Sequence, residues 1–389
     1  MTKLGLRVGI SVAPLLLLAC GAPESGGPVE MEKLELAGAT AVSGGQFHSC
    51  AIRPNGTVAC WGRNHKGQLG TGVADSLRHS TPVNVVGITN AVAIAAGRFH
   101  TCAVLADGTA RCWGQNFSGQ LGNGTNTDSF SPVAVSGLTG ATAIAAGSYF
   151  ACALLRDGTG RCWGQGLYGQ LGNGGTTNRN VPVVVSGLSG ATDLEVGNAH
   201  GCAVLSTGAA RCWGRNESGQ LGNGNNATST VPVAVAGINN ATDIDAGGDH
   251  ACAVRAGGGV SCWGTGLSGE LGNGGNVNSN VPVTVSRLTN ATGITSGSAH
   301  NCAVRSDGSV RCWGENGSGQ LGNGSTTNSN VPVAVSGIST ARTVGSGDGH
   351  VCALLGDGTA RCWGRNLYGQ LGNGTLVESA IPTQVISYP

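Results

Sequence analysis

The chain has 389 residues, of which 70 are glycine and only 11% are charged, a composition that favours many short strands joined by tight turns over a helical protein. Its formal net charge of +1 provides no overall basic field to hold nucleic acid or an anionic membrane, and no acidic excess to keep the chain unfolded. Any partner is therefore recognised by a local group of residues.

The N-terminus has the pattern of an export signal. A basic start (Lys3, Arg7) precedes an apolar stretch over residues 8–19, which is too short to span a bilayer. The stretch ends in Leu-Leu-Ala-Cys, which resembles the bacterial lipobox, so we expect a signal peptide over 1–19 and a lipid on Cys20. The alternative is an ordinary signal with a chance cysteine. Gly, Pro and Glu dominate the next ten residues, which predicts a flexible tether over 20–35 and a protein anchored in the bacterial envelope, facing the periplasm or the exterior.

From residue 36 to the end the chain repeats itself. Tryptophans recur with a spacing of 52 once and 50 thereafter, which defines seven units. The third unit contains four short strand patterns, over residues 133–135, 141–147, 151–155 and 160–164. We therefore predict an all-β, seven-bladed β-propeller over residues 36–389.

The two ends of the repeat predict how the ring closes. The first unit lacks the Pro-Val-x-Val strand that precedes the other units, and residues 381–385 supply such a strand with no unit after it. We expect this C-terminal strand to pair beside the first blade and complete it.

Each unit carries two cysteines ten positions apart. A three-residue turn such as 106–108 makes Leu105 face Thr109 across the hairpin, and counting back places Cys102 opposite Cys112. We predict seven disulfides within blades, as suits an exported protein. Zinc is the alternative, but this spacing does not cluster ligands, so we predict no metal. The expected bonds join Cys50 to Cys60, Cys102 to Cys112, Cys152 to Cys162, Cys202 to Cys212, Cys252 to Cys262, Cys302 to Cys312 and Cys352 to Cys362.

The repeat also resembles a known family. Residues 147–172 read Gly, Cys-Ala-Leu-Leu, Asp-Gly, Cys-Trp-Gly and Gly-Gln-Leu-Gly at fixed spacing, which resembles the regulator of chromosome condensation repeat. The resemblance implies a seven-bladed propeller. The eukaryotic founder exchanges guanine nucleotides on the GTPase Ran and docks on nucleosomes, whereas similar exported bacterial propellers include a secreted inhibitor of β-lactamases. The export signal, paired cysteines and lack of a basic tail argue against the founder's roles here.

No residue pattern indicates catalysis. Histidine precedes the first cysteine of the pair by two positions in six units, and a residue repeated so regularly serves the blade. The Gly-Gln-Leu-Gly-Asn-Gly loops lack the Lys-Ser/Thr of a phosphate loop, and Asp243, Asp245 and Asp249 lack calcium-loop spacing. We predict no enzyme activity and no cofactor.

Function is expected where the units differ. Residues 169–367 contain no Phe or Tyr, so these aromatics gather in units seven, one, two and three, which ring closure makes neighbours. Acidic residues such as Asp193, Glu195, Asp243 and Asp245 lie across the ring. Aromatics and arginine favour protein binding; the alternative is that they fill blade interfaces. The candidate partner-binding residues are Phe47, Arg63, Arg98, Phe99, Phe117, Tyr149, Tyr168, Arg365 and Tyr368.

Three functions follow from these observations. The first is a protein-binding scaffold or inhibitor of a secreted or periplasmic protein, held at the membrane through Cys20. The second is a carbohydrate-binding propeller, since aromatics also stack on sugars; degradation of a polysaccharide would need paired acids in one pocket. The third, guanine-nucleotide exchange, rests on family resemblance alone. We predict no nucleic-acid partner.

Overall fold

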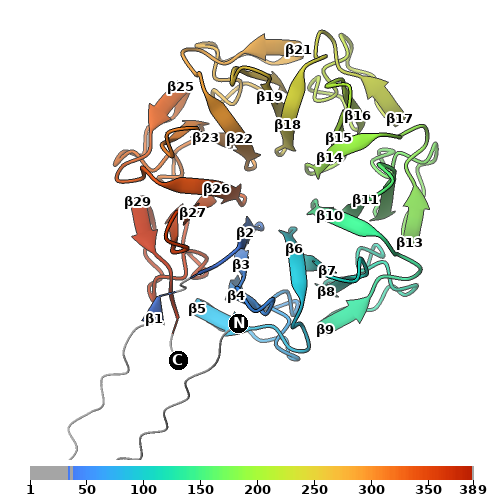
Figure 1. Cartoon of the computed structure of the whole chain (residues 1–389), viewed down its shortest axis with the longest axis vertical. Helices are drawn as coiled ribbons and strands as arrows, with labels where there is room; N and C mark the ends of the chain where they lie inside the picture. Colours follow the sequence, from blue (N-terminus) through green and yellow to red (C-terminus); the bar gives the residue numbers. More distant parts are fainter. Residues whose placement is uncertain (1–33, 36–37, 388–389) are drawn as a thin grey trace, which may run out of the picture. The chain divides into compact units, whose positions relative to one another are not determined.

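The protein is described here by a computed structural model that covers residues 34–35 and 38–387. Seven four-stranded antiparallel sheets are arranged as blades around a central axis (Figure 1), so the predicted seven-bladed propeller is confirmed. The signal, Cys20 and most of the tether lie outside the described residues.

In every blade the four strands follow one another in the chain, from the innermost to the outermost. The blades are β2 (Ala41–Gly44), β3 (His48–Ile52), β4 (Val58–Arg63), β5 (Arg78–Asn84); β6 (Ala91–Ala96), β7 (His100–Leu105), β8 (Ala110–Gly114), β9 (Ser129–Ala134); β10 (Ala141–Ala146), β11 (Phe150–Leu155), β12 (Gly160–Gly164), β13 (Arg179–Val184); and β14 (Ala191–Val196), β15 (His200–Leu205), β16 (Ala210–Gly214), β17 (Ser229–Ala234). The remaining three are β18 (Ala241–Ala246), β19 (His250–Arg255), β20 (Val260–Gly264), β21 (Ser279–Thr284); β22 (Ala291–Ser296), β23 (His300–Arg305), β24 (Val310–Gly314), β25 (Ser329–Ala334); and β26 (Ala341–Ser346), β27 (His350–Leu355), β28 (Ala360–Gly364), β29 (Ser379–Gln384).

The hairpin between the second and third strands of a blade fixes the disulfide. In the second blade Leu105 N–H donates to Thr109 O, and Gly108 takes a φ of 77° that suits glycine. This turn places Cys102 directly opposite Cys112, as predicted.

All seven predicted disulfides are present. Their Cα atoms are 4.0 to 4.1 Å apart, and all fourteen cysteines are fully buried. The bonds join Cys50 to Cys60, Cys102 to Cys112, Cys152 to Cys162, Cys202 to Cys212, Cys252 to Cys262, Cys302 to Cys312 and Cys352 to Cys362.

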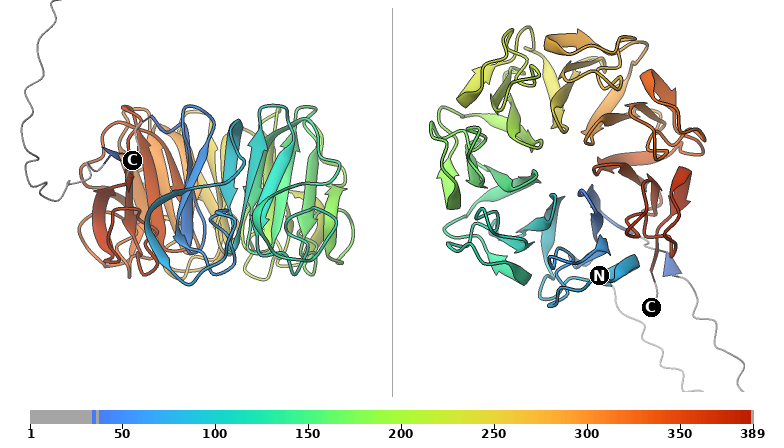
Figure 2. Two further views of the ribbon diagram at one scale, coloured as in Figure 1. Left: turned by 90° about the horizontal axis from the view of Figure 1, so that it is seen from below. Right: turned by 180° about the vertical axis from the view of Figure 1, so that it is seen from behind.

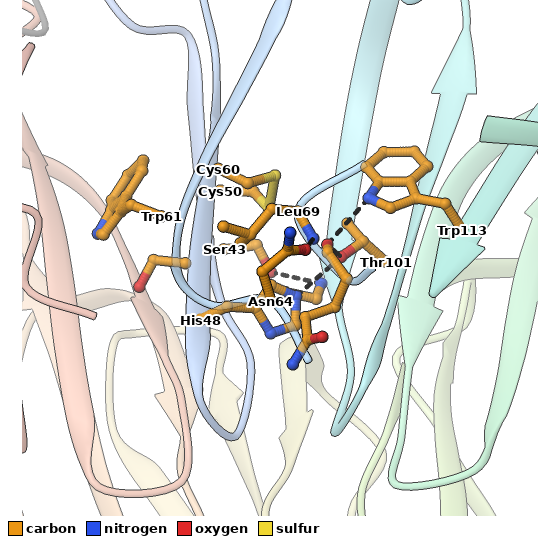
Figure 3. The surroundings of a disulfide bond; sticks show 12 residues. Ser43, His48, Cys50, Cys60, Trp61, Asn64, Leu69, Thr101 and Trp113 are labelled. Carbon is orange, nitrogen blue, oxygen red and sulfur yellow. Dashed lines mark hydrogen bonds between the residues drawn. A yellow bond between two sulfur atoms is a disulfide. The ribbon is translucent and has the colours of Figure 1, made fainter. Parts of the chain in front are cut away.

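The repeated tryptophan joins one blade to the next. Trp113 of the second blade is fully buried against Leu69 and Val85 of the first. Its indole N–H donates to the Gln68 carbonyl at 2.9 Å, and Figure 3 shows Trp113 and Leu69 at this junction. The tryptophan of each following blade makes the equivalent bond to the blade before it. The Gly-Gln-Leu-Gly loop therefore forms the binding site for the tryptophan of the next blade.

The predicted closure of the ring is wrong in one respect. The C-terminal strand β29 pairs with β28 of the seventh blade, and the first blade has its own outer strand, β5. The prediction counted the Pro-Val-x-Val strand as the first strand of the unit that follows it. In the structure this strand is the fourth and outermost strand of the blade that precedes it, because each blade consists of four consecutive strands. The first and last strands of the described residues still meet, because β1 (Leu34–Glu35) pairs with β30 (Ile386–Ser387).

The seam between the seventh and first blades repeats the contacts of the other seams. Trp61 Nε1–H donates to the Gln370 carbonyl at 2.8 Å, and Ser49 Oγ–H donates to the same carbonyl at 2.9 Å. Val385, which follows β29, is fully buried with Ala39 and Trp61. The ring is therefore closed by side-chain packing as well as by the short pairing of the chain ends.

A matched pair of glycine variants tests whether this loop is packed tightly against the tryptophan of the next blade. Gly172 has a φ of 66°, and a Cβ there would lie 2.9 Å from Trp213 Nε1, whereas Gly174 has a φ of 85° and open space around it. Both alanine variants carry the left-handed strain of about 1–2 kcal/mol. We expect Gly172→Ala to lower the free energy of unfolding by a further ~1–3 kcal/mol through overpacking, measured by guanidinium titration. Equal losses in the two variants would contradict the assigned role of Trp213.

The disc has two different faces, seen edge-on in Figure 2. Strand direction alternates within a blade, so the loops after the first and third strands share one face, which we call the loop face. The tight turns after the second strands and the linkers between blades share the other, which we call the turn face. A backbone bond from Ala106 to Asn90 joins such a turn to such a linker at 2.9 Å. The described residues contain no helix long and apolar enough to cross a membrane.

Candidate functional site: an aromatic arc on the loop face

Aromatic side chains of the seventh, first and second blades meet on the loop face. Phe47 stacks on Phe99 with ring centroids 5.4 Å apart, and meets the Tyr368 ring edge-on at 5.3 Å. The Arg63 guanidinium lies over two of these rings, 5.3 Å from the Phe47 centroid and 4.6 Å from that of Tyr368. These distances are typical of aromatic pairs and cation–π contacts.

The same row continues into the third blade. The Arg98 guanidinium lies 5.3 Å from the ring centroids of both Phe99 and Tyr149 and so bridges them. Tyr149 in turn meets Phe117 edge-on at 5.2 Å, and Phe117 is 54% exposed. We call this row the aromatic arc; it comprises Phe47, Arg63, Arg98, Phe99, Phe117, Tyr149 and Tyr368.

Two of the nine predicted residues do not belong to the arc. Tyr168 lies under the guanidinium of Arg215 in the fourth blade, at 5.5 Å. Arg365 donates to the Asp348 carboxylate at 3.2 Å. Phe150, which replaces the recurrent histidine, is fully buried and fills a blade interface.

The sequence analysis missed one member of this neighbourhood. His65 meets Phe99 edge-on at 5.1 Å, and burial together with the charges of Arg63 and Lys66 lowers the pKa of His65 to about 4. The imidazole is therefore neutral at physiological pH and adds to the apolar edge of the arc. Its position between two basic residues in the first long loop was the available signal, but it was outside the recurrent histidine set.

The recurrent histidines are buried structural residues. His48 Nε2 bonds Thr101 Oγ1 of the next blade at 2.8 Å, His350 Nε2 bonds Ser49 Oγ at 2.7 Å, and His250 Nε2 bonds Asn301 Oδ1 at 2.9 Å. In the other three cases the equivalent position of the next blade is alanine or valine, namely Ala151, Ala251 and Val351. Burial lowers the pKa of all six, to about 3 or about 4.

Four acidic residues lie on the innermost strands of the fourth and fifth blades, and Glu195, Asp243 and Asp245 among them line a central channel of about 530 Å³. Three of the carboxylates accept a backbone N–H of the next blade: Asp193 from Ile244 at 3.0 Å, Asp243 from Ile294 at 2.8 Å, and Asp245 from Ser296 at 2.8 Å. Burial, with further contributions from neighbouring carboxylates, raises the pKa of Asp243 to about 8 and that of Asp245 to about 7.

These acids do not sit beside the aromatic arc. They project from β14 and β18, whereas the arc lies over the first three blades and the seventh. Between the arc and the channel, the first loops of neighbouring blades join by backbone bonds, such as Gln46 N–H to Gly97 O at 3.2 Å. Among the described residues no group of three or more His, Cys, Asp or Glu side chains is arranged to hold a metal ion.

Fold and site together define a class: a rigid repeat propeller that presents an asymmetric patch on a symmetric ring. A model of the RCC1-like domain matches residues 18–250, and the regulator of chromosome condensation (RCC1) repeat matches residues 257–304, 307–354 and 357–389. The chain therefore belongs to the RCC1-like family.

Curated relatives match over short stretches. The human protein RCC2 is 42% identical over 93 residues, which cover 23% of this chain and 17% of RCC2. The protein pim1 of Schizosaccharomyces pombe is 31% identical over 113 residues, covering 26% and 21%. The ultraviolet-B receptor UVR8 of Arabidopsis thaliana is 42% identical over 85 residues, covering 22% and 19%. The matched stretches thus span about a fifth of the relatives' own length.

Solved structures share the fold along most of the chain. Human WBSCR16 superposes with a TM-score of 0.76 at 22% identity, covering 85% of this chain and 94% of that one. Prp20p of Saccharomyces cerevisiae superposes with a TM-score of 0.74 at 19% identity, covering 86% and 87%. The latter structure is described together with the binding of Prp20p to Gsp1p and histones.

Proposed function

We propose that this chain is a protein-binding propeller of the bacterial cell envelope, anchored through Cys20, and that the aromatic arc docks its protein partner. The observation that carries the proposal is the unbroken row of aromatic and guanidinium groups from Tyr368 to Phe117 on the loop face. Tyr, Arg and other large side chains on a rigid scaffold carry most of the binding energy at protein interfaces.

The placement of the arc supports this role. Loops on a rigid ring can vary without cost to the core, and residues 169–367 carry no Phe or Tyr with which to repeat the arc. Binding of protein partners by another member of the fold, Prp20p, is consistent with the proposal. The seven disulfides favour an oxidising compartment, which suits an exported protein. We do not propose guanine-nucleotide exchange, because only the family resemblance supports it.

The test compares arc variants with a matched control on the same face. Phe47→Ala, Phe99→Ala and Tyr149→Ala together are expected to weaken capture of envelope proteins by at least ~30-fold, equivalent to the loss of one strong hot spot of about 2 kcal/mol. Leu267→Ala with Val277→Ala removes apolar groups that are 67% and 68% exposed outside the arc, and should leave capture unchanged. The measurement is quantitative mass spectrometry of cross-linked, affinity-purified complexes.

The second candidate is a carbohydrate-binding arc, which the exposed Phe117 ring favours. Isothermal titration with cell-wall and surface polysaccharides separates the two. Binding of a glycan that is lost in the arc variant, with no protein captured, would replace the first candidate by the second. Capture of the same proteins by the arc variant and by the control would contradict the first candidate, and glycan binding that is absent or equal in the parent and the arc variant would contradict the second.

A further inference from the structure

The charges of the propeller are distributed unequally between its two faces. On the turn face the second residue of the third strand is arginine in five blades: Arg111, Arg161, Arg211, Arg311 and Arg361. Six further arginines lie in or beside the turns and linkers: Arg53, Arg156, Arg255, Arg287, Arg305 and Arg342.

Few acidic side chains oppose these arginines. The turns contribute four aspartates, Asp107, Asp157, Asp307 and Asp357, so the described part of the turn face carries seven more arginines than aspartates. On the loop face seven basic and eight acidic side chains nearly cancel, and the other four acids of the described blades belong to the inner strands β14 and β18. The overall charge of +1 therefore conceals one strongly basic face.

The chain enters and leaves the ring at this same face. Ala39 N–H donates at 3.1 Å to the carbonyl of Gly358, which lies in the tight turn of the seventh blade. Val385 N–H donates at 2.9 Å to Ala360 O, next to the same turn. The chain therefore enters the first blade, at Ala39, on the basic face, opposite the face that carries the aromatic arc.

One arginine occupies a backbone position that disfavours side chains. Arg287 has a φ of 55°, and the equivalent linker position in five other blades is glycine with φ between 66° and 69°. A Cβ at those glycines would meet no atom within 4 Å, so the Arg287 side chain projects into solvent and gains no packing that would offset the strain. Arg287 therefore adds a solvent-exposed positive charge to the turn face at a position that five other blades fill with glycine.

We propose that the turn face is a docking surface for an anionic lipid bilayer, so that the propeller lies with its arginines on the headgroups and the aromatic arc pointing away from the membrane. The orientation rests on the proposed anchor at Cys20; the affinity of the face for anionic lipid does not. A lipid anchor combined with a basic patch holds a protein to a membrane more firmly than the lipid alone, because each basic residue near the surface adds its own attraction.

The test measures co-sedimentation of the unlipidated mature chain, residues 20–389 carrying Cys20→Ser, with vesicles of phosphatidylcholine alone or with 30 mol% phosphatidylglycerol. Binding only to the anionic vesicles, and its release when salt is raised from 0.05 to 0.5 M, is the expected result. Each arginine removed should weaken binding about fivefold. The triple variant Arg156→Gln, Arg211→Gln, Arg287→Gly should therefore bind on the order of 100-fold more weakly.

A charge-matched control distinguishes binding through the turn face from a general effect of the protein's net charge. Lys66→Gln, Arg179→Gln and Arg215→Gln remove three positive charges from the loop face, outside the arc, and should leave vesicle binding within about threefold of the parent. Arg287→Gly alone should weaken vesicle binding while raising the guanidinium midpoint of unfolding, because it relieves backbone strain. A loss caused by misfolding would instead lower that midpoint.

Three results would overturn the proposal: no preference for anionic vesicles, equal losses in the two triple variants, or binding to double-stranded DNA as tight per phosphate as to the vesicles. None of these results tests the aromatic arc, whose role is measured by protein capture. None of them tests lipidation of Cys20, which is measured by the mass of the native protein. The membrane-docking face and the proposed partner site can therefore fail independently.

Discussion

Full reduction of the seven disulfides is expected to unfold the propeller at neutral pH. Each bond closes a loop of about ten residues, which in the chain-entropy model contributes about 2–3 kcal/mol. The bonds lie in separate blades, so their contributions add approximately. Their sum of roughly 14–21 kcal/mol equals or exceeds the upper part of the about 5–15 kcal/mol range by which most folded proteins are stable. The measurement is near-ultraviolet circular dichroism of the buried tryptophans after refolding from guanidinium with and without reductant.

A single-blade variant shows whether the effect belongs to the bond. Replacing Cys202 and Cys212 together by alanine should lower the free energy of unfolding of the oxidised protein by ~2–3 kcal/mol. In reductant the variant and the parent should behave almost alike. A reduced parent chain that folds with a native tryptophan spectrum would contradict the account and remove one argument for an oxidising compartment.

Stability is expected to peak near pH 6 and to fall on both sides. On the acid side, the six buried histidines keep pKa values of about 3 or about 4 when folded, while unfolded histidines accept protons below about pH 6.5. Their stabilisation is complete above pH 6.5 and is lost as the pH falls towards 4, by about 1.4 kcal/mol per pH unit for each histidine.

On the alkaline side the channel acids act in the opposite direction. Folding raises the pKa of Asp243 to about 8 and of Asp245 to about 7, so their stabilisation is present below about pH 4 and lost as the pH rises through 7 to 8. Guanidinium midpoints measured from pH 4 to 9 should therefore describe a maximum. A stability that rises steadily from pH 6 to 9 would contradict the raised pKa values.

Two substitutions separate the two limbs of this profile. His200→Phe, which copies Phe150 of the preceding blade, should remove about 1.4 kcal/mol per pH unit from the acid slope and leave the alkaline slope unchanged. Asp243→Asn keeps an oxygen that can accept the Ile294 N–H. Folded Asp243 holds its proton from about pH 4 to about pH 8 while the unfolded residue has lost it, so this variant should flatten the alkaline slope and steepen the acid slope, each by about 1.4 kcal/mol per pH unit. A changed alkaline slope in His200→Phe, or an unchanged alkaline slope in Asp243→Asn, would show that the assignment of the limbs is wrong.

Much of the fold was predictable because it repeats. The 50-residue period, the turn at 106–108 and the spacing of Cys102 and Cys112 specified the number of blades and the disulfides. A period does not, however, say which strand begins a sheet, so the closure was assigned to the wrong blade. The acids of β14 and β18 were placed across the ring from the arc, but only the alternation of side chains on the inner strands turns them towards the channel.

The part of the site that was predictable consists of residues that differ between the repeats. Contacts between loops that are distant in the sequence were not predictable. The gap in Phe and Tyr between residues 169 and 367 located the arc. Tyr168 contacts Arg215, and Arg365 contacts Asp348. In both pairs the two residues come from different loops, so no local sequence pattern predicts the contact. The basic turn face was missed because the net charge averages both faces, and only strand direction sorts the arginines between them.

The central claim is that the arc, and no other part of the loop face, contacts the protein partner. Photo-cross-linking from living cells tests it directly, with a benzoylphenylalanine placed at Tyr149 in the arc or at Leu267 in the fifth blade. We predict that position 149 yields a discrete cross-linked protein and that position 267 does not. The same cross-linked species from both positions, or from position 267 alone, would contradict the account.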